Sequence, residues 1–139
     1  MSPRTSASCV RVGIMLFDTD VLIWCFRGVA KAAKAIEADN APAISVVTYM
    51  ELAQGARDRR ELRTIKSFLS DLGIPIIPLT ENIGHRASIY VEEHALAHGM
   101  TMGDALIAAT AMERGLALCS GNAKHFKVVD ELELVVFKP

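Results

Sequence analysis

The sequence has few aromatic residues and almost no net charge, and each shortage excludes a class of protein. Aromatic residues make up 6% of the 139 residues whereas 51% are hydrophobic, so the core must be built mainly from aliphatic side chains. With 15 basic and 16 acidic residues, the formal net charge is -1, which excludes non-specific nucleic-acid binding through overall charge. Any contact with a polyanion must therefore come from a local basic patch.

Cysteines and long apolar runs are also scarce. Cys9, Cys25 and Cys119 are odd in number and far apart, with no C-x-x-C pair and no zinc-like spacing. This pattern favours a reducing compartment, and we expect a cytoplasmic protein. No apolar stretch reaches the roughly 20 residues that cross a bilayer, so we expect no membrane span.

The length of the chain favours a single domain. Residues 1–13 contain two arginines and several small residues but no continuous apolar core, which makes a poor signal peptide. We therefore expect a flexible N-terminal extension over residues 1–13 and one folded domain over residues 14–139.

Short aliphatic segments alternate with helical segments along the chain. We expect strands at 14–17, 43–46, 74–79, 116–119 and 134–137, separated by helices at 21–26, 29–38, 48–56, 59–72, 81–98 and 103–114. Pro75 and Pro78 favour a sheet edge for the third strand, because proline cannot donate to the ladder. The alternation predicts an α/β fold, with a central, mainly parallel sheet covered by helices on both faces. Any site is expected at the carboxyl ends of the strands.

Three acidic residues fall where such a site is expected. Asp18 directly follows the first strand, Glu51 lies in the helix after the second, and Asp104 begins a nearly all-apolar helix. Each has an alternative explanation as a helix cap. Asp18 can cap the next helix, and Thr48 with Glu51, or Thr101 with Asp104, has the spacing of a capping box.

The alternative to three caps is a metal site at the strand ends. Carboxylate oxygens suit Mg²⁺ or Mn²⁺, and such an ion can activate water and screen a phosphate without a Ser, Cys or His nucleophile. Asn122, in Ser120-Gly-Asn, follows the fourth strand and could complete the site, although Gly-Asn is also ordinary turn chemistry. The spacing alone leaves both explanations open.

Four ordered segments resemble the PIN-domain ribonucleases, most closely the VapC-type toxins of VapBC toxin–antitoxin systems. They are Met15-Leu-Phe-Asp-Thr-Asp-Val-Leu-Ile, Ser45-Val-Val-Thr-Tyr-Met-Glu-Leu-Ala-Gln-Gly, Met102-Gly-Asp-Ala-Leu-Ile-Ala-Ala-Thr-Ala and Leu118-Cys-Ser-Gly-Asn-Ala-Lys-His-Phe. The resemblance runs from about Met15 to Phe137.

This resemblance implies a three-layer α/β/α PIN-like domain with about five strands. It implies Mg²⁺- or Mn²⁺-dependent RNA hydrolysis, with Asp18, Glu51 and Asp104 as metal ligands and Asn122 at the fourth position. It also implies a cognate VapB-like antitoxin and a homodimer. The sequence departs from the family pattern at Asp20, where Ser or Asn is common, and at Asn122, where the family often has an acid.

The densest basic stretch comprises Arg57, Arg59, Arg60, Arg63 and Lys66. It could contact RNA phosphates or acidic residues of an antitoxin, or it could be a solvated helix face interleaved with Asp58 and Glu61. His125 is expected in a loop or at the rim of the site.

Two competing functions remain. Phe17-Asp-Thr-Asp also resembles the nucleophile motif of haloacid-dehalogenase-type phosphatases, although Leu22 and the residues after Asp104 do not fit that family. The other alternative is a catalytically silent PIN-like binding module.

Overall fold

Residues 15–139 are described in a computed structural model of the protein. The predicted extension at residues 1–13, and the first residue of the predicted first strand, lie outside the described residues. The strands of this part of the chain are β1 (Met15–Phe17), β2 (Ile44–Ser45), β3 (Ile76–Ile77), β4 (Ala117–Ser120) and β5 (Leu134–Val136). Its helices are α2 (Thr19–Phe26), α3 (Ala30–Glu37), α4 (Val46–Gln54), α5 (Arg59–Asp71), α6 (Glu81–His98), α7 (Met102–Arg114) and α8 (Ala123–Phe126).

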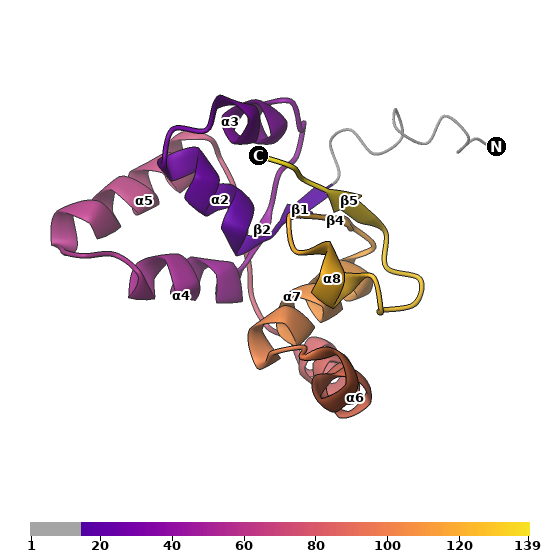
Figure 1. The fold of residues 1–139 in the computed structure, drawn as a ribbon. Coiled ribbons are helices and arrows are strands. Elements are labelled where there is room, and N and C mark those ends of the chain that lie inside the picture. The colour runs from indigo at the N-terminus through magenta and orange to yellow at the C-terminus, as the bar shows by residue number, and fades with distance from the viewer. Residues whose placement is uncertain (1–14) are drawn as a thin grey trace.

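All the strand pairs in the described chain are parallel. One sheet has the order β1-β4-β5, and a second sheet pairs β2 with β3. An isolated parallel bridge between Leu16 and Ala43 joins the two sheets, and there the Phe17 N–H donates to the Ala43 carbonyl at 2.9 Å. The strands therefore all point the same way, and their carboxyl ends meet along one edge (Figure 1).

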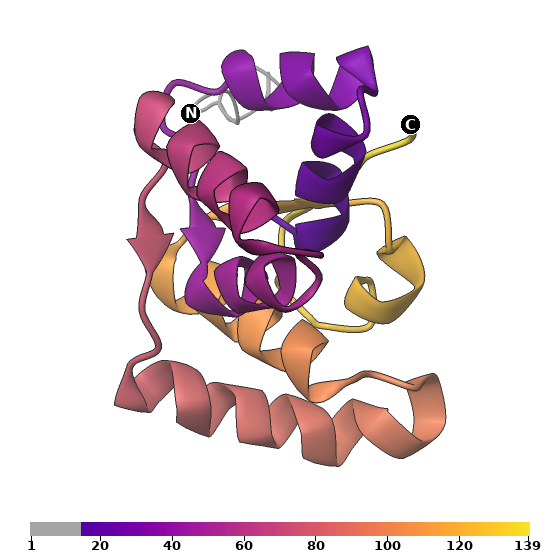
Figure 2. The same ribbon diagram turned by 90° about the vertical axis from the view of Figure 1, so that its left-hand side faces the viewer.

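Helices cover both faces of the strands, as expected from the alternating sequence. Leu16 and Phe17 are consecutive in β1 and fully buried, yet they belong to different hydrophobic clusters because successive strand residues point to opposite faces. Leu118 and Cys119 divide in the same way in β4. One cluster is closed by α6 and α7, and the other by α2, α3 and α5 (Figures 1 and 2). The three-layer α/β/α prediction is confirmed.

The structure corrects two local predictions. The helix expected from residue 48 begins at Val46, because Ser45 is its N-cap and accepts the Val47 N–H at 3.0 Å. Thr48 is therefore inside α4, and the capping box predicted for Thr48 and Glu51 does not form. Helix α8 was not predicted, since four residues after a Gly-Asn turn carry no readable period.

The third strand lies at a sheet edge, as Pro75 and Pro78 predicted. Within the described chain β3 pairs only with β2, so it forms an edge. Pairing is limited to Ile44 with Ile76 and Ser45 with Ile77, which is shorter than the sequence predicted. In residues 15–139 no helix is both long and apolar enough to cross a membrane.

The difference in burial between Leu118 and Leu96 predicts very different effects of the same substitution on stability. Leu118 in β4 is fully buried, so Leu118→Ala should lower the free energy of unfolding by about 2–5 kcal/mol through lost packing and a residual cavity. Leu96 in α6 is fully exposed, and Leu96→Ala should change it by less than about 0.5 kcal/mol. Urea unfolding followed by circular dichroism measures both, and equal losses would contradict the core assignment.

Candidate metal centre

Asp18 lies between the ends of two neighbouring strands. The β1–β4 register pairs Phe17 with Cys119, so the next residue on each strand, Asp18 and Ser120, are neighbours. The Ser120 hydroxyl donates to Asp18 Oδ2 at 2.7 Å, and the Thr19 N–H donates to Oδ1 at 2.8 Å. Asp18 is the N-cap of α2, so the capping explanation is correct. A cap does not require a carboxylate that is only 6% exposed, however.

Burial and neighbouring acids make the charge on Asp18 costly. Burial, with smaller contributions from the charges of Asp20 and Asp104, raises the pKa of Asp18 to about 7 against the lowering effect of the hydrogen bonds from Ser120 and Thr19. Burial likewise raises the pKa of Asp20, whose Oδ2 accepts the Gly121 N–H at 3.0 Å. Asp20 Oδ1 is buried and has no hydrogen-bond partner. The site therefore holds more negative charge than its own residues neutralise.

Glu51 reaches the same region from α4. The Thr19 hydroxyl contacts Glu51 Oε1 at hydrogen-bonding distance, and Thr19 Oγ1 also lies 3.0 Å from Thr48 Oγ1. A Cβ built on Gly103 would come within 3.0 Å of Glu51 Oε2, so the carboxylate lies against the first turn of α7. A side chain at position 103 would require the Glu51 carboxylate to shift by a few tenths of an ångström, so Glu51 lies beside the residue that precedes Asp104.

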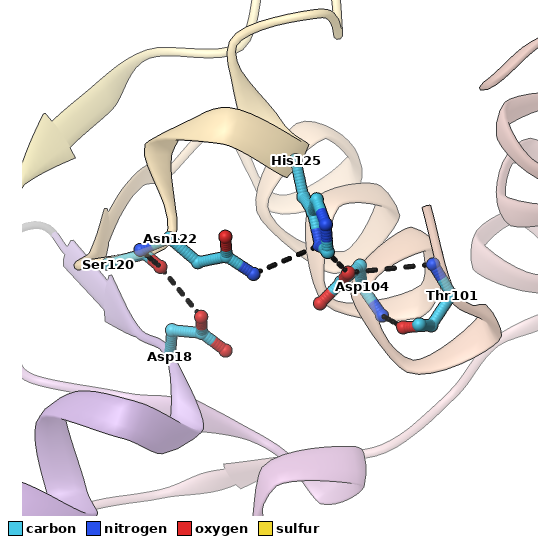
Figure 3. Close-up of polar contacts among 6 residues, drawn as sticks. All are labelled: Asp18, Thr101, Asp104, Ser120, Asn122 and His125. Carbon is cyan, nitrogen blue, oxygen red and sulfur yellow. Dashed lines mark hydrogen bonds and ion pairs between the residues drawn. The ribbon is translucent and has the colours of Figure 1, made fainter. Parts of the chain in front are cut away.

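Asp104 is held at the start of α7. It forms the predicted capping box with Thr101, whose hydroxyl accepts the Asp104 N–H at 3.1 Å. Its Oδ2 lies 2.7 Å from His125 Nδ1, and Asn122 Nδ2 lies 3.0 Å from the same ring nitrogen. Figure 3 shows Asp18 just after β1, Asp104 in α7, Asn122 just before α8 and His125 in α8 facing a common space.

The structure thus brings four of the predicted site residues together at one edge of the sheet: Asp18, Glu51, Asp104 and Asn122. It also adds Thr19 and Ser120, which contact these residues and were not predicted, and it places His125, expected in a loop or at the rim of the site, in contact with Asp104. The position of Ser120 follows from the parallel register of β1 and β4, which the sequence alone does not give.

The donor set fits a hard divalent cation. The groups are carboxylate, amide and hydroxyl oxygens, which suit Mg²⁺ or Mn²⁺, and the unpartnered Asp20 Oδ1 together with the raised Asp18 pKa indicates uncompensated negative charge. In residues 15–139 no three acidic, histidine or cysteine side chains converge as a formed metal site. Asp18, Glu51 and Asp104 would together hold an ion that keeps several of its water ligands, as Mg²⁺ commonly does.

The predicted basic stretch lies elsewhere. It occupies the turn between α4 and α5 and the first half of α5, at the end of this helical hairpin that points away from the sheet (Figure 1). Arg57 pairs with Glu61 at 2.9 Å in an exposed setting, while Arg60 and Arg63 line a surface hollow with Phe68. No contact joins this stretch to Asp18, Glu51 or Asp104 within the described residues.

Comparison with known proteins agrees with the geometry. The model of the PIN-domain family matches residues 15–132. The ribonuclease VapC10 of Mycobacterium tuberculosis is 37% identical over 127 residues, which cover 86% of this chain and 91% of that protein. The chain belongs to the VapC-type ribonucleases of the PIN-domain family. This membership decides against the phosphatase hypothesis.

Solved structures of toxin–antitoxin complexes share the fold. A toxin–antitoxin complex from Klebsiella pneumoniae contains a chain with 32% identity and a TM-score of 0.74, matched over 88% of this chain and 96% of that one. The VapBC2 complex from Rickettsia felis, bound to a promoter DNA fragment, has 21% identity and a TM-score of 0.76, matched over 90% and 99%. The second likeness supports the PIN fold alone.

The burial of Asp18 predicts a pH-dependent gain in stability for Asp18→Asn. The pKa of Asp18 is about 7 in the folded protein, against 3.8 for the ordinary group. Above pH 7 the carboxyl is ionised in both states, and the full cost of its buried charge then lowers the stability of the metal-free fold. In EDTA at pH 8, Asp18→Asn should therefore raise the free energy of unfolding by about 1–4 kcal/mol. The gain should shrink as the pH falls below 7, and it should vanish only below about pH 4, once the carboxyl is protonated in the unfolded state as well. Thermal unfolding across this range measures it, and a less stable variant at pH 8 would contradict the assignment.

Proposed function

We propose that this protein is a metal-dependent endoribonuclease toxin in which Asp18, Glu51 and Asp104 hold Mg²⁺ or Mn²⁺ for hydrolysis of RNA phosphodiesters. The observation that carries the proposal is the meeting of these acids at the strand ends of a VapC-type chain, with none of them paired to Arg or Lys among the described residues. The chemistry that such an ion supplies is activation of a water nucleophile and screening of the phosphate charge.

The protein's own residues orient the carboxylates. Ser120 holds Asp18, the Thr19 hydroxyl holds Glu51, and the α7 capping box fixes the backbone of Asp104. These donors are neutral, so each acid keeps the negative charge that a cation and its waters require. Asn122, which precedes α8, would offer its amide as a further polar group to the waters of the ion or to RNA.

The partners follow from the same family. The Klebsiella pneumoniae chain at 32% identity comes from a toxin–antitoxin complex, which supports neutralisation of this protein by a VapB-like antitoxin. We also propose a homodimer in the cytoplasm. The α5 residues Arg59, Arg60, Arg63 and Lys66, with Arg57 before them, are proposed to contact RNA phosphates or acidic antitoxin side chains.

Removing one proposed ligand tests the function. Asp104→Asn keeps the side-chain oxygen of the capping box but removes the charge, and it should reduce Mg²⁺-dependent RNA cleavage at least about 100-fold, to the level of EDTA-treated protein. It should also relieve growth arrest on induction. The matched control is Asp71→Asn, an equivalent change at the exposed end of α5. Full cleavage by folded Asp104→Asn would overturn the proposal. No cleavage by the wild type with Mg²⁺ or Mn²⁺ would support a silent binding module instead.

A second test uses the space beside Glu51. Gly103→Ala would push a methyl group against the Glu51 carboxylate, so cleavage should fall about tenfold or more while the fold is retained. Gly84→Ala is the matched control in a helix, because a Cβ there would meet nothing within 4 Å. Cleavage assays at a fixed Mg²⁺ concentration compare the two. Equal activity of both variants would show that the Glu51 position does not matter for cleavage.

A further inference from the structure

Among residues 15–139, His125 is the one imidazole that contacts a proposed metal ligand. It lies in α8, a helix of four residues that follows the Gly121–Asn122 turn, and its Nδ1 is 2.7 Å from Asp104 Oδ2. Both side chains are mostly buried, with exposed fractions of 25% for His125 and 15% for Asp104. The contact joins residues that are 21 positions apart and come from different helices.

The contacts of Asp104 fall on one of its two oxygens. Oδ2 faces His125 Nδ1 and, at a longer 3.5 Å, the Thr101 N–H. Oδ1 has no hydrogen-bond partner among residues 15–139. Figure 3 shows this second oxygen turned away from the imidazole, on the side where Asp18 lies. The imidazole therefore holds one oxygen while the other remains available to the common space.

The chemistry of the pair defines where the proton lies. An ionised carboxylate only accepts hydrogen bonds, so His125 Nδ1 must carry a hydrogen to bind Asp104. Nδ1 has a single position in the ring plane, and it cannot also accept from Asn122 Nδ2, which lies 3.0 Å away. The contact with the carboxylate is the shorter and is charge-assisted, so it prevails. The Asn122 amide is then not tied to the ring and stays available at the site.

We infer that His125 is a positioning residue for Asp104, whose Oδ2 it holds through Nδ1–H so that Oδ1 stays directed at the cation. This inference rests on the proposed metal-dependent function and concerns how one ligand is oriented. Partners that orient a metal ligand typically change metal affinity 10–100-fold when they are removed. The capping box cannot replace the imidazole, because its contact to the side chain is the long one, at 3.5 Å.

Two substitutions of His125 separate the orienting hydrogen bond from the bulk of the side chain. An Asn amide nitrogen can occupy about the position of Nδ1, whereas a Gln amide nitrogen reaches about the position of Nε2. His125→Gln should therefore weaken Mn²⁺ binding by about 10–100-fold, and His125→Asn should restore it to within about threefold of the wild type. Mn²⁺ titration followed by electron paramagnetic resonance measures this without RNA.

Cleavage assays and spectroscopy add independent readouts. At saturating Mn²⁺, His125→Gln should recover cleavage with an unchanged KM for RNA, because the site is correctly filled once the ion binds. In ¹⁵N spectra of the metal-bound protein, the imidazole signal that disappears in His125→Gln is the signal of His125. This signal should show that Nδ1 carries a proton. An unprotonated Nδ1, or equal Mn²⁺ affinity of wild type and His125→Gln, would overturn the inference.

Failure of the positioning role of His125 can be distinguished from failure of the proposed metal-dependent function. If Asp104→Asn abolishes cleavage while His125→Gln binds Mn²⁺ normally, the metal centre stands and the positioning role fails. If Asp104→Asn cleaves RNA and binds Mn²⁺ as the wild type does, the metal centre itself is wrong. Thermal unfolding of each variant verifies that the comparison is made between folded proteins.

Discussion

The burial of the Asp18 carboxylate at the joint between β1 and β4 constrains the rest of the site. Parallel pairing leaves the strand ends at one edge, and the carboxylate that continues β1 there is only 6% exposed. The nearby charges of Asp20 and Asp104 increase its free-energy cost in the absence of a counter-ion. The fold keeps this unfavourable group at a defined position with the Ser120 hydroxyl and the α2 N-terminus. Such a locally unfavourable arrangement is expected where a bound cation supplies the missing charge.

The fold was largely predictable because its signals are local. Aliphatic strands, helix caps and prolines act within a few residues, and they located α6, α7 and the edge strand β3 to within about the usual uncertainty of element ends. The interpretation of Glu51 as a capping residue failed because Ser45, the last residue of β2, is the N-cap of α4, so Thr48 lies inside the helix. Thr48 instead contacts Thr19, 29 residues away, which no local pattern predicts.

The location of the three acids in the fold was predictable from the sequence, but the groups that contact them were not. Asp18, Glu51 and Asp104 could be placed at the strand ends from topology and from the PIN-domain resemblance. His125 could not be linked to Asp104 from sequence, because the link depends on how α8 packs against the start of α7. The same limit applies to Gly103, whose importance appears only when the Glu51 carboxylate is seen against it.

The partners of the acids explain how the site can be ordered and still bind a cation. An Arg or Lys beside Asp18 would relieve the repulsion among the acids, but it would also compete with the metal ion for the same charge. In the described chain the Arg ion pairs are made elsewhere, at Arg57 and Arg86. Hydroxyl groups hold Asp18 and Glu51, and an imidazole holds Asp104, so each acid is oriented largely by hydrogen bonds rather than by a fixed positive charge. Under the proposed metal-dependent function, acids that are oriented without being neutralised make the stability of the strand ends depend on the cation, and the binding of that cation is coupled to the order of the site.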